Sequence, residues 1–392
     1  MNEENAIKIK ELLTRGVEEV INFENLEKKL KSGKKLRVKF GIDPTSPNIH
    51  IGRAVPLFKL RDFQDLGHQI VFIIGDFTGV IGDTSDKESE RPMLQSEEVK
   101  KNMENYINQA NKILDINKCE IHYNSEWLGK LGYKEIGEHA DVFSVSNFIA
   151  RDNIKKRLDT GKRVSLREVL YPLMQGYDSV EVKSDIEIGG TDQRFNLLAG
   201  RELQKHYNQE PQDIIMNPII EGLDGRKMSS SWGNVVNIFD KPNDMYGKIM
   251  SLKDEYIIKY FMFTTRVPLV KIEEYKSMLK SGSNPRDIKM KLAFYLVNFY
   301  YSENDAKKAE DFFANTFTKK EIPVDVKEFK PVDYNIVSFL VESKLVNSKS
   351  ESRRVIEQGG VRVNGKIMKD LGYNLSSNEV VQKGKINFIK II

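Results

Sequence analysis

The sequence predicts a multidomain protein that opens with a doubly wound α/β domain, continues as helices and ends in a small α+β unit. Its 392 residues correspond to about two or three domains. In the first half, short apolar or β-rich runs alternate with longer stretches of helical spacing, which is typical of a parallel sheet covered on both faces. The expected strands are residues 37–42, 70–74, 120–123, 185–188 and 214–220.

After about Asn237 the pattern changes to mostly helix. Helices are expected over residues 244–262, 270–279 and 285–301, because these stretches hold helix-forming residues and few breakers. The segment 318–331 is rich in charge and contains two prolines, so it is expected to be a linker before the last unit.

The composition excludes several classes of protein. Hydrophobic residues make up 40% of the chain, which is enough for packed cores. A single cysteine excludes a disulfide framework, a thiolate zinc site and an iron–sulfur cluster, and it favours a reducing compartment. The first ten residues have no apolar run, so no signal peptide is expected, and the longest apolar stretch is too short to span a bilayer. We therefore expect a soluble, cytoplasmic protein with no membrane contact.

The excess positive charge of the chain lies at its C-terminal end. Residues 331–392 hold ten basic and six acidic side chains, a net charge of +4, which equals the net charge of the whole chain. A basic unit beside a neutral body indicates a polyanionic partner at that end. Ordinary surface charge would explain the same count.

The first expected strand runs into a polar turn with the sequence GIDPTSPNIHIGR at residues 41–53. Thr45, Ser46 and His50 would supply hydrogen-bond donors at a helix N-terminus, where backbone N–H groups already favour an anion. Gly52 would let a flat ring or a phosphate approach the backbone. Taken alone, an ordinary strand-to-helix turn explains this segment better.

A second polar segment, DGRKMSSS at residues 224–231, contains one lysine and three serines between Gly225 and Gly233. It describes a mobile loop with one cation and several hydroxyl groups, which suits closure over a polyphosphate. Idle surface loops also carry lysine–serine clusters, so this segment alone decides nothing.

In order, the two segments resemble the HIGH and KMSKS elements of class I aminoacyl-tRNA synthetases, as HIGR at 50–53 and KMSSS at 227–231. Three blocks between them resemble bacterial tyrosyl-tRNA synthetases: IGDFTGVIGD at 74–83, YPLMQGYD at 171–178 and GGTDQ at 189–193. The resemblance runs from about Leu36 to the end of the chain. It implies a tyrosine–tRNA ligase, which activates L-tyrosine with ATP to tyrosyl-adenylate and pyrophosphate and transfers tyrosine to the 3′ end of tRNA(Tyr).

The resemblance implies a set of tyrosine-binding residues. Asp83, Tyr171 and Gln175 match positions that hold the α-ammonium group, whose three donors need acceptors. Asp178 matches the residue that accepts a hydrogen bond from the phenol, so phenylalanine should be rejected, a discrimination known for this enzyme class. Gln193 matches a position near the substrate carboxylate and the α-phosphate.

On the ATP side, the resemblance implies that Gly52 admits adenine, that Gly190 and Asp192 hold the ribose, and that Thr45 and His50 contact phosphates. The full ATP-binding set is Gly41, Asp43, Gly52, Gly190, Asp192 and Lys227. The catalytic set is Thr45, His50, Arg53, Lys227 and Ser230. No general acid or base is needed, because the tyrosine carboxylate is already a nucleophile. Mg²⁺ should travel on the ATP phosphates, with no metal held by the protein.

Three residues depart from the commonest pattern of the family. Arg53 replaces the last histidine of HIGH and keeps a cation of different shape. Ser230 replaces the second lysine of KMSKS and removes a positive charge, for which Arg226 is a candidate replacement. Lys39 stands where many relatives have a tyrosine that contacts the phenol, and one bacterial branch carries lysine there. It serves the tyrosine site or it pairs with a nearby carboxylate, and both interpretations stay open.

Residues 336–366 resemble an S-four-type RNA-binding domain. Two short helices precede a tight Gly359–Gly360 turn, a strand at 361–363 and the hairpin signal Asn364–Gly365. A basic face on this unit would suit phosphates and irregular RNA. Its expected members are Arg353, Arg354, Arg362 and Lys366.

The expected organisation is a catalytic domain over 1–236, a helical anticodon-side domain over 237–325 and the S-four-type domain over 331–392. Relatives place a dimer contact in the region 102–163, so a helical dimerisation insertion and a homodimer are implied by the resemblance. The two rival interpretations are a tryptophan-specific ligase, against which Asp178 and the 171–178 block argue, and an RNA-binding paralogue that has lost adenylation. Retention of the polar residues of the site argues against the paralogue.

Overall fold

The computed structural model describes residues 3–83, 93–318, 326–384 and 387–392. Contacts between residues divide the chain into two compact units. The first consists of Met1–Lys241 and Lys248–Tyr300, and the second of Pro242–Gly247 and Tyr301–Ile392. The helices of 248–300 thus cluster with residues 1–241, whereas a separate helical domain was expected for them from the sequence.

A six-stranded sheet forms the centre of the first unit. Its strand order is β1-β6-β5-β2-β3-β4, with β1 antiparallel to β6 at one edge and the other neighbouring pairs parallel. The strands are β1 (Glu19–Ile21), β2 (Arg37–Ile42), β3 (Gln69–Ile74), β4 (Glu120–Tyr123), β5 (Ile186–Gly190) and β6 (Asp213–Asn217). The doubly wound, Rossmann-like α/β prediction is therefore confirmed, and β1 is an edge strand that it did not include.

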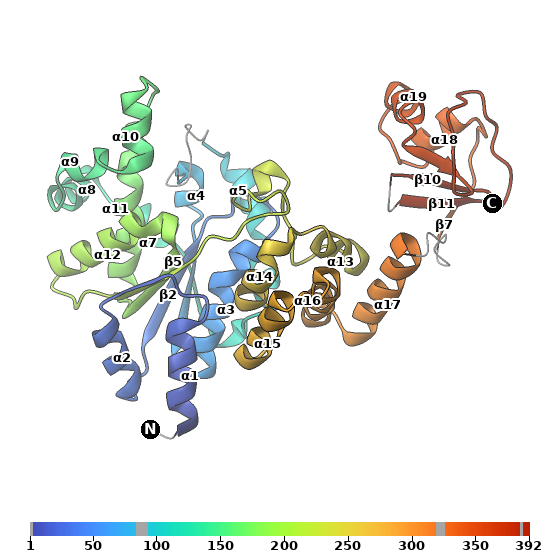
Figure 1. Cartoon of the computed structure of the whole chain (residues 1–392). Helices are drawn as coiled ribbons and strands as arrows, with labels where there is room; N and C mark the ends of the chain where they lie inside the picture. The colour runs from blue at the N-terminus through green and yellow to red at the C-terminus, as the bar shows by residue number, and fades with distance from the viewer. Residues whose placement is uncertain (1–2, 84–92, 319–325, 385–386) are drawn as a thin grey trace. The chain divides into compact units, whose positions relative to one another are not determined.

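Helices cover both faces of this sheet (Figure 1). On one face lies α3 (Ile51–Asp65), which packs on β2, β3 and β5 and also contacts α1 (Glu3–Thr14). On the other face lie α11 (Leu166–Glu181) and α12 (Arg194–His206). Because neither face meets water, an unbroken apolar strand such as β3 can be buried along nearly its whole length.

Most of the remaining helices of the first unit are short. Before β4 they are α2 (Phe23–Lys31), α4 (Thr78–Ile81), α5 (Ser96–Met103) and α6 (Tyr106–Ala110). After β4 they are α7 (Ser125–Leu128), α8 (Tyr133–Asp141), α9 (Val145–Ile149) and α10 (Asp152–Asp159). The expected helical insertion at 102–163 therefore also contains β4, a strand of the central sheet, and α7 to α10 follow that strand.

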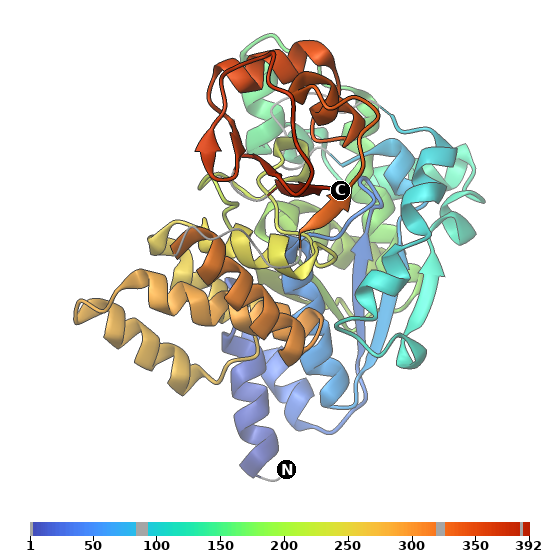
Figure 2. The same cartoon turned by 90° about the vertical axis from the view of Figure 1, so that its right-hand side faces the viewer.

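The expected single helix over 244–262 is wrong. The structure has α13 (Pro242–Met250) and α14 (Ile257–Thr264), separated by a turn. In that turn the backbone carbonyl of Leu252 accepts a hydrogen bond from Lys289 Nζ (2.5 Å), so it needs no helical partner. α14 then packs with α15 (Leu269–Lys280) and α16 (Pro285–Tyr300), and Figures 1 and 2 show this group beside α3.

The second unit ends in a small mixed sheet of order β7-β11-β10-β8-β9. Its strands are β7 (Lys327–Phe329), β8 (Val361–Val363), β9 (Lys366–Ile367), β10 (Val380–Lys383) and β11 (Asn387–Ile391). The expected linker 318–331 is wrong at its C-terminal end, because β7 pairs with β11 and Phe329 packs on the core of this unit. Residues 319–325 of that linker lie outside the described residues.

The α-helices that lie wholly within the second unit are α17 (Glu303–Phe313), α18 (Ile336–Glu342) and α19 (Lys349–Glu357), and the first part of α13 also belongs to it. The hairpin signal between β8 and β9 is confirmed, since Asn364 and Gly365 both have positive φ, 49° and 79°. Such a two-residue turn matches the twist of the two flanking strands. Helices, tight turn and hairpin follow in the predicted order, so the small α+β unit is present.

The close approach of α11 to α12 depends on Gly176. A Cβ built at this residue would lie 2.9 Å from Leu203 Cδ1 and 3.1 Å from backbone atoms of Ala199 and Gly200. We expect Gly176→Ala to destabilise the first unit by about 1–3 kcal/mol, since backbone atoms cannot move aside cheaply. Urea unfolding followed by circular dichroism measures it. Gly137→Ala is the matched control, because that exposed helical glycine has no atom within 4 Å of the new Cβ, and equal losses in both variants would contradict this account.

Candidate active site

A pocket of about 270 Å³ opens at the carboxyl ends of the strands in the first unit. Its lining comes from the end of β2, the following turn, the first turn of α3, α11, the ends of β5 and β6, and the loop 227–231. Lys39 is the one residue predicted for this site that does not line it. The predicted residues that do are Gly41, Asp43, Thr45, His50, Gly52, Arg53, Asp83, Tyr171, Gln175, Asp178, Gly190, Asp192, Gln193, Lys227 and Ser230.

Asp178 lies buried at one end of the pocket, on α11. Its Oδ1 accepts a hydrogen bond from Trp127 Nε1 (2.8 Å), and its Oδ2 accepts one from Asn124 Nδ2 (3.3 Å). Burial raises the pKa of this carboxyl to about 7, although the charge of Lys39 and the two hydrogen bonds act in the opposite direction. The group is therefore a buried acceptor that changes charge near neutral pH.

Asp43 and Tyr171 meet in the same part of the pocket. Tyr171 donates its hydroxyl hydrogen to Asp43 Oδ2 (2.8 Å), and Thr78 Oγ1 donates to Asp43 Oδ1 (2.8 Å). Burial and the nearby Asp43 charge raise the pKa of the Tyr171 phenol well above its usual range, so it stays protonated. Asp43 was predicted among ATP-binding residues, and here its carboxylate faces a residue of the predicted tyrosine set.

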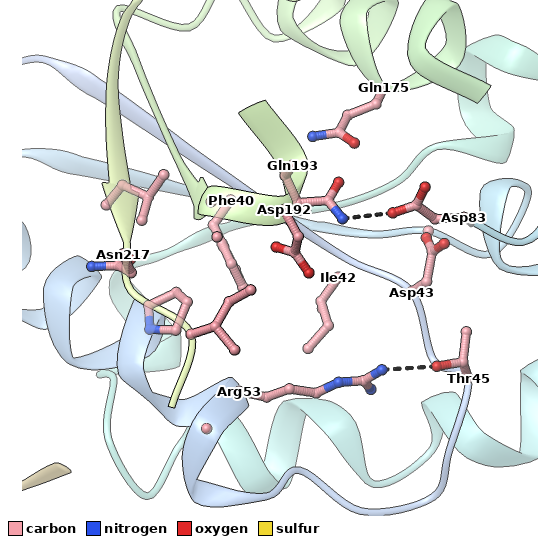
Figure 3. A pocket seen from close by; sticks show the side chains of 18 of the residues that line it. Phe40, Ile42, Asp43, Thr45, Arg53, Asp83, Gln175, Asp192, Gln193 and Asn217 are labelled. Carbon is pink, nitrogen blue, oxygen red and sulfur yellow. Dashed lines mark hydrogen bonds between the residues drawn. The ribbon is translucent and has the colours of Figure 1, made fainter. Parts of the chain in front are cut away.

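Three side-chain amides join Asp83 to α11. Gln193 Nε2 donates to Asp83 Oδ2 (2.5 Å), and Asn196 Nδ2 donates both to Gln193 Oε1 (2.9 Å) and to Gln175 Oε1 (3.0 Å). Figure 3 shows the Gln175 and Gln193 amides reaching into the pocket from two elements, with Asp83 bonded to Gln193. This group is rich in oxygen atoms, which suits a ligand that carries several N–H donors.

Lys39 is buried behind the pocket on β2, with none of its surface exposed. Its Nζ forms an ion pair with Glu187 Oε1 (2.9 Å) and donates to Ser179 Oγ (2.7 Å) and to the Gln175 backbone carbonyl (2.8 Å). An ammonium group has three donors, so these contacts use all of them. Of the two interpretations of Lys39, the geometry favours pairing with a carboxylate over direct contact with a substrate.

At the other end of the pocket, His50 caps the N-terminus of α3. Its Nδ1 accepts a hydrogen bond from the Arg53 backbone N–H (3.3 Å). Burial, together with the charges of Arg53 and Lys227, lowers the pKa of His50 to about 3, so the ring is neutral at pH 7. Arg53 reaches Thr45 Oγ1 (2.9 Å, Figure 3) and Tyr106 Oη (2.9 Å).

The loop 227–231 is held against the pocket by Lys227, whose Nζ forms an ion pair with Asp192 Oδ2 (2.7 Å). Arg226 pairs with Asp224 (2.5 Å), and its guanidinium lies 4.7 Å from the centre of the Trp232 ring. Arg226 does not line the pocket, so the structure does not support its replacing the charge that Ser230 lacks. Ser230 itself lines the pocket and is exposed.

The four residues predicted to bind RNA are all exposed on the second unit. Arg353 and Arg354 lie on α19, Arg362 lies on β8 and Lys366 on β9. The two strand residues belong to one tight hairpin, in which Val363 pairs with Lys366. Their exposure leaves these cations available for a polyanion.

Several polar residues that shape the site were not predicted from the sequence. Asn124 and Trp127 follow β4 directly, and residues beyond the carboxyl end of a parallel strand are expected at the ligand edge of the sheet. That rule could have found them. Glu187 interrupts an apolar strand, which was a usable signal of a buried charge, whereas Asn196 in a helix gave no signal.

Neither a protein-held metal nor a membrane segment was found in the part of the chain that the structure describes. Within residues 3–83, 93–318, 326–384 and 387–392, no three His, Cys, Asp or Glu side chains are grouped so that they could hold a metal ion. Within the same ranges, no helix is long and apolar enough to cross a bilayer.

Comparison with known proteins gives matches over nearly the whole chain. The family model for class I tRNA synthetases (W and Y) matches residues 31–318, and the S4 domain model matches 336–381. A tyrosine–tRNA ligase of Thermotoga maritima is 45% identical over all of this chain and 98% of its own length. Tyrosine–tRNA ligase 2 of Clostridium acetobutylicum is 46% identical over 97% of each chain.

Solved structures show the same architecture. Tyrosyl-tRNA synthetase of Archaeoglobus fulgidus, crystallised with L-tyrosine, has a TM-score of 0.63 at 25% identity and covers 78% of this chain and 99% of its own. A truncated mitochondrial tyrosyl-tRNA synthetase of Coccidioides posadasii has a TM-score of 0.62 at 23% identity, over 79% and 95% of the two chains. At 23% identity, the similarity to the Coccidioides posadasii structure shows the fold alone.

The strand-end pocket, the two motif loops and the family match define a class I aminoacyl-tRNA synthetase. More narrowly, the chain belongs to the tyrosine–tRNA ligase family, with an S4 domain at its C-terminal end.

The neutral His50 predicts a specific pH dependence of stability. Its folded-state pKa of about 3 lies below the ordinary value of 6.5, so its contribution is complete above pH 6.5 and is lost as the pH falls. Relative to His50→Gln, we expect the wild type to lose about 2 kcal/mol of unfolding free energy between pH 6.5 and pH 5. Urea titrations at stepped pH measure this difference. Parallel pH curves for the two proteins would show that His50 is not held neutral.

Proposed function

We propose that the pocket binds L-tyrosine at its Asp178 end and ATP at its His50 end, so that this tyrosine–tRNA ligase forms tyrosyl-adenylate between them. This proposal rests on one observation, which is that the two ends of the pocket carry different chemical groups. A buried carboxylate and a group of amide and carboxylate oxygens lie at one end, and Thr45, His50, Arg53 and Lys227 lie at the other.

At the tyrosine end, Asp178 accepts a hydrogen bond from the phenol. The carboxylate is buried, so a ligand without that hydroxyl leaves its pocket-facing lone pairs without a donor. Asp83, Tyr171 and Gln175 surround the α-ammonium group, and Gln193 lies toward the carboxylate that reacts. Lys39 lies behind this site and does not contact tyrosine; it contacts Glu187, Ser179 and the Gln175 backbone carbonyl.

At the ATP end, Gly52 lines the pocket and presents no side chain to the adenine. A Cβ there would crowd its neighbours, at 3.0 Å from His50 Nδ1 and 3.3 Å from Ile220 Cγ1. Asp192 accepts hydrogen bonds from the ribose hydroxyls. Lys227, which now forms an ion pair with Asp192, is then free to move toward the phosphates. A neutral His50 then serves as a hydrogen-bond donor to a phosphate oxygen. Gly41, Gly190 and Asp43 complete the ATP contacts or their immediate support.

The reaction needs no proton transfer to start. The tyrosine carboxylate attacks the α-phosphorus in line, the bond to the bridging oxygen breaks, and pyrophosphate leaves. Thr45, Arg53, Lys227 and Ser230 stabilise charge on the phosphates, and Mg²⁺ is carried on ATP by phosphates and water. Tyrosine then passes to the 3′ end of tRNA(Tyr), which the basic face of the second unit helps to bind.

We also propose that two copies of the chain associate as a homodimer. Several apolar side chains are exposed on the helices that follow β4, and association of two chains through these helices would cover them. Within the region 102–163, Tyr133 is 96% exposed and Val145 72%, while Ile149 and Leu158 are also exposed. We further propose a cytoplasmic site of action, where charged tRNA is consumed.

The function is tested by amino-acid-dependent exchange of pyrophosphate into ATP, without tRNA. We expect exchange with tyrosine and a loss of at least about 100-fold in kcat for Lys227→Met, which removes a donor to the developing phosphate charge. Lys205→Met, which removes the exposed ion pair with Glu202 on α12, is the control and should leave kcat unchanged. Exchange with tryptophan alone would discard the tyrosine pocket. RNA binding by folded protein without any exchange would favour the non-enzymatic paralogue.

The dimer is tested by charging its proposed surface. Val145→Asp together with Leu158→Asp places two carboxylates in the region that association would bury, so the dimer should dissociate. Sedimentation velocity at micromolar concentration should change from a mass of about twice the 45.2 kDa chain to that of one chain. Val270→Asp, at an exposed valine on α15, is the control. A monomeric wild type would overturn the proposed dimer.

A further inference from the structure

Behind the tyrosine end of the pocket, β2 and β5 bring two opposite charges together. Lys39 and Glu187 are register partners in neighbouring parallel strands, so their side chains emerge side by side on the same face of the sheet. Both side chains are buried, at 0% and 1% exposed. Burying a charge pair is costly unless its remaining donors and acceptors are satisfied, so the way in which this pair is satisfied is informative.

Both Glu187 oxygens accept hydrogen bonds. Oε1 accepts from Lys39 Nζ (2.9 Å) and from Gln175 Nε2 (3.2 Å). Oε2 accepts from Ser179 Oγ (3.1 Å) and from Gln212 Nε2. A carboxylate can only accept hydrogen bonds. The Gln175 amide therefore points its nitrogen toward Glu187, and the amide oxygen points away from Glu187.

A second carboxylate fixes the other end of this hydrogen-bond chain. Asp83 accepts a hydrogen bond from the amide nitrogen of Gln193, so the Gln193 oxygen points toward Asn196. Asn196 then donates its two N–H bonds to the oxygens of Gln193 and Gln175. With carboxylates at both ends, the orientation of all three amides is determined, and reversing one amide would place like groups against each other.

We propose that Glu187, neutralised by Lys39, is a positioning residue that fixes Gln175 with its amide oxygen toward the ligand. This inference rests on the proposed function, in which Gln175 accepts a hydrogen bond from the tyrosine α-ammonium group. Lys39 supports the same geometry from the backbone, because it also holds the Gln175 carbonyl (2.8 Å). Neither residue contacts tyrosine, and both set its affinity through Gln175.

The proposal predicts a loss that is confined to ligands with an ammonium group. Tyrosine and 3-(4-hydroxyphenyl)propionate differ in that group alone, so calorimetry on the full chain without ATP compares their affinities. Glu187→Gln should weaken tyrosine binding by about 10- to 100-fold, the range expected for a hydrogen bond to a charged group. The affinity for the propionate should not change.

Two further variants keep the test decisive. Glu187→Gln leaves the Lys39 charge unpaired, so the double variant Lys39→Met/Glu187→Gln, which removes both charges, should fold and show the same selective loss. Ser179→Ala is the matched control, because Ser179 touches both charged groups but not the Gln175 amide. It should leave the ratio of the two affinities unchanged.

Gln175→Met separates this inference from the proposed site. If Gln175→Met loses tyrosine selectively and Glu187→Gln does not, Glu187 has no positioning role. An equal loss for both ligands in Glu187→Gln and in the double variant would show general damage to the pocket and would also overturn the proposal. If Gln175→Met leaves the ratio unchanged, the assignment of the ammonium site itself fails.

Discussion

The parallel pairing of β2 with β5 is the constraint on which the site depends. It joins two strands that are about 150 residues apart in the chain and aligns their carboxyl ends, so the turns after both strands open at one edge of the sheet. One turn leads to His50 and α3, and the other leads to Asp192 and Gln193. The same pairing sets Lys39 beside Glu187 behind the pocket. A change of register would move all of these groups together.

The site obtains its electrostatics mainly by excluding water. Burial raises the pKa of Asp178 to about 7 and lowers that of His50 to about 3, so an acid is held near its neutral state and a base is held neutral. At neutral pH the Asp178 shift costs stability in the protein without ligand, whereas the His50 shift costs stability only as the pH falls below 6.5. We infer that a phenol and a triphosphate supply the missing donors and charges, which directs binding energy to the groups that identify tyrosine and ATP.

Much of this arrangement was predictable from sequence. The strand-end positions of Thr45 and His50 followed from alternating strands and helices, and Gln193 followed from the family resemblance; all three line the pocket. The partner of Lys39 was not predictable, because it depends on the register between β2 and β5, and Glu187 lies 148 positions further along the chain. The break between α13 and α14, the edge strand β1 and the pairing of β7 likewise depend on tertiary hydrogen bonds that override local propensity.

The most direct test of the account is the proton exchange that accompanies tyrosine binding. With a pKa of about 7, Asp178 is about half protonated at neutral pH, and accepting the phenol hydrogen bond should favour its ionised form. Calorimetry at pH 7 in two buffers of different ionisation enthalpy should show net proton release, with tyrosine affinity rising as the pH increases through 7. Binding without proton release and with no pH dependence between 6 and 8 would contradict recognition of the phenol by Asp178.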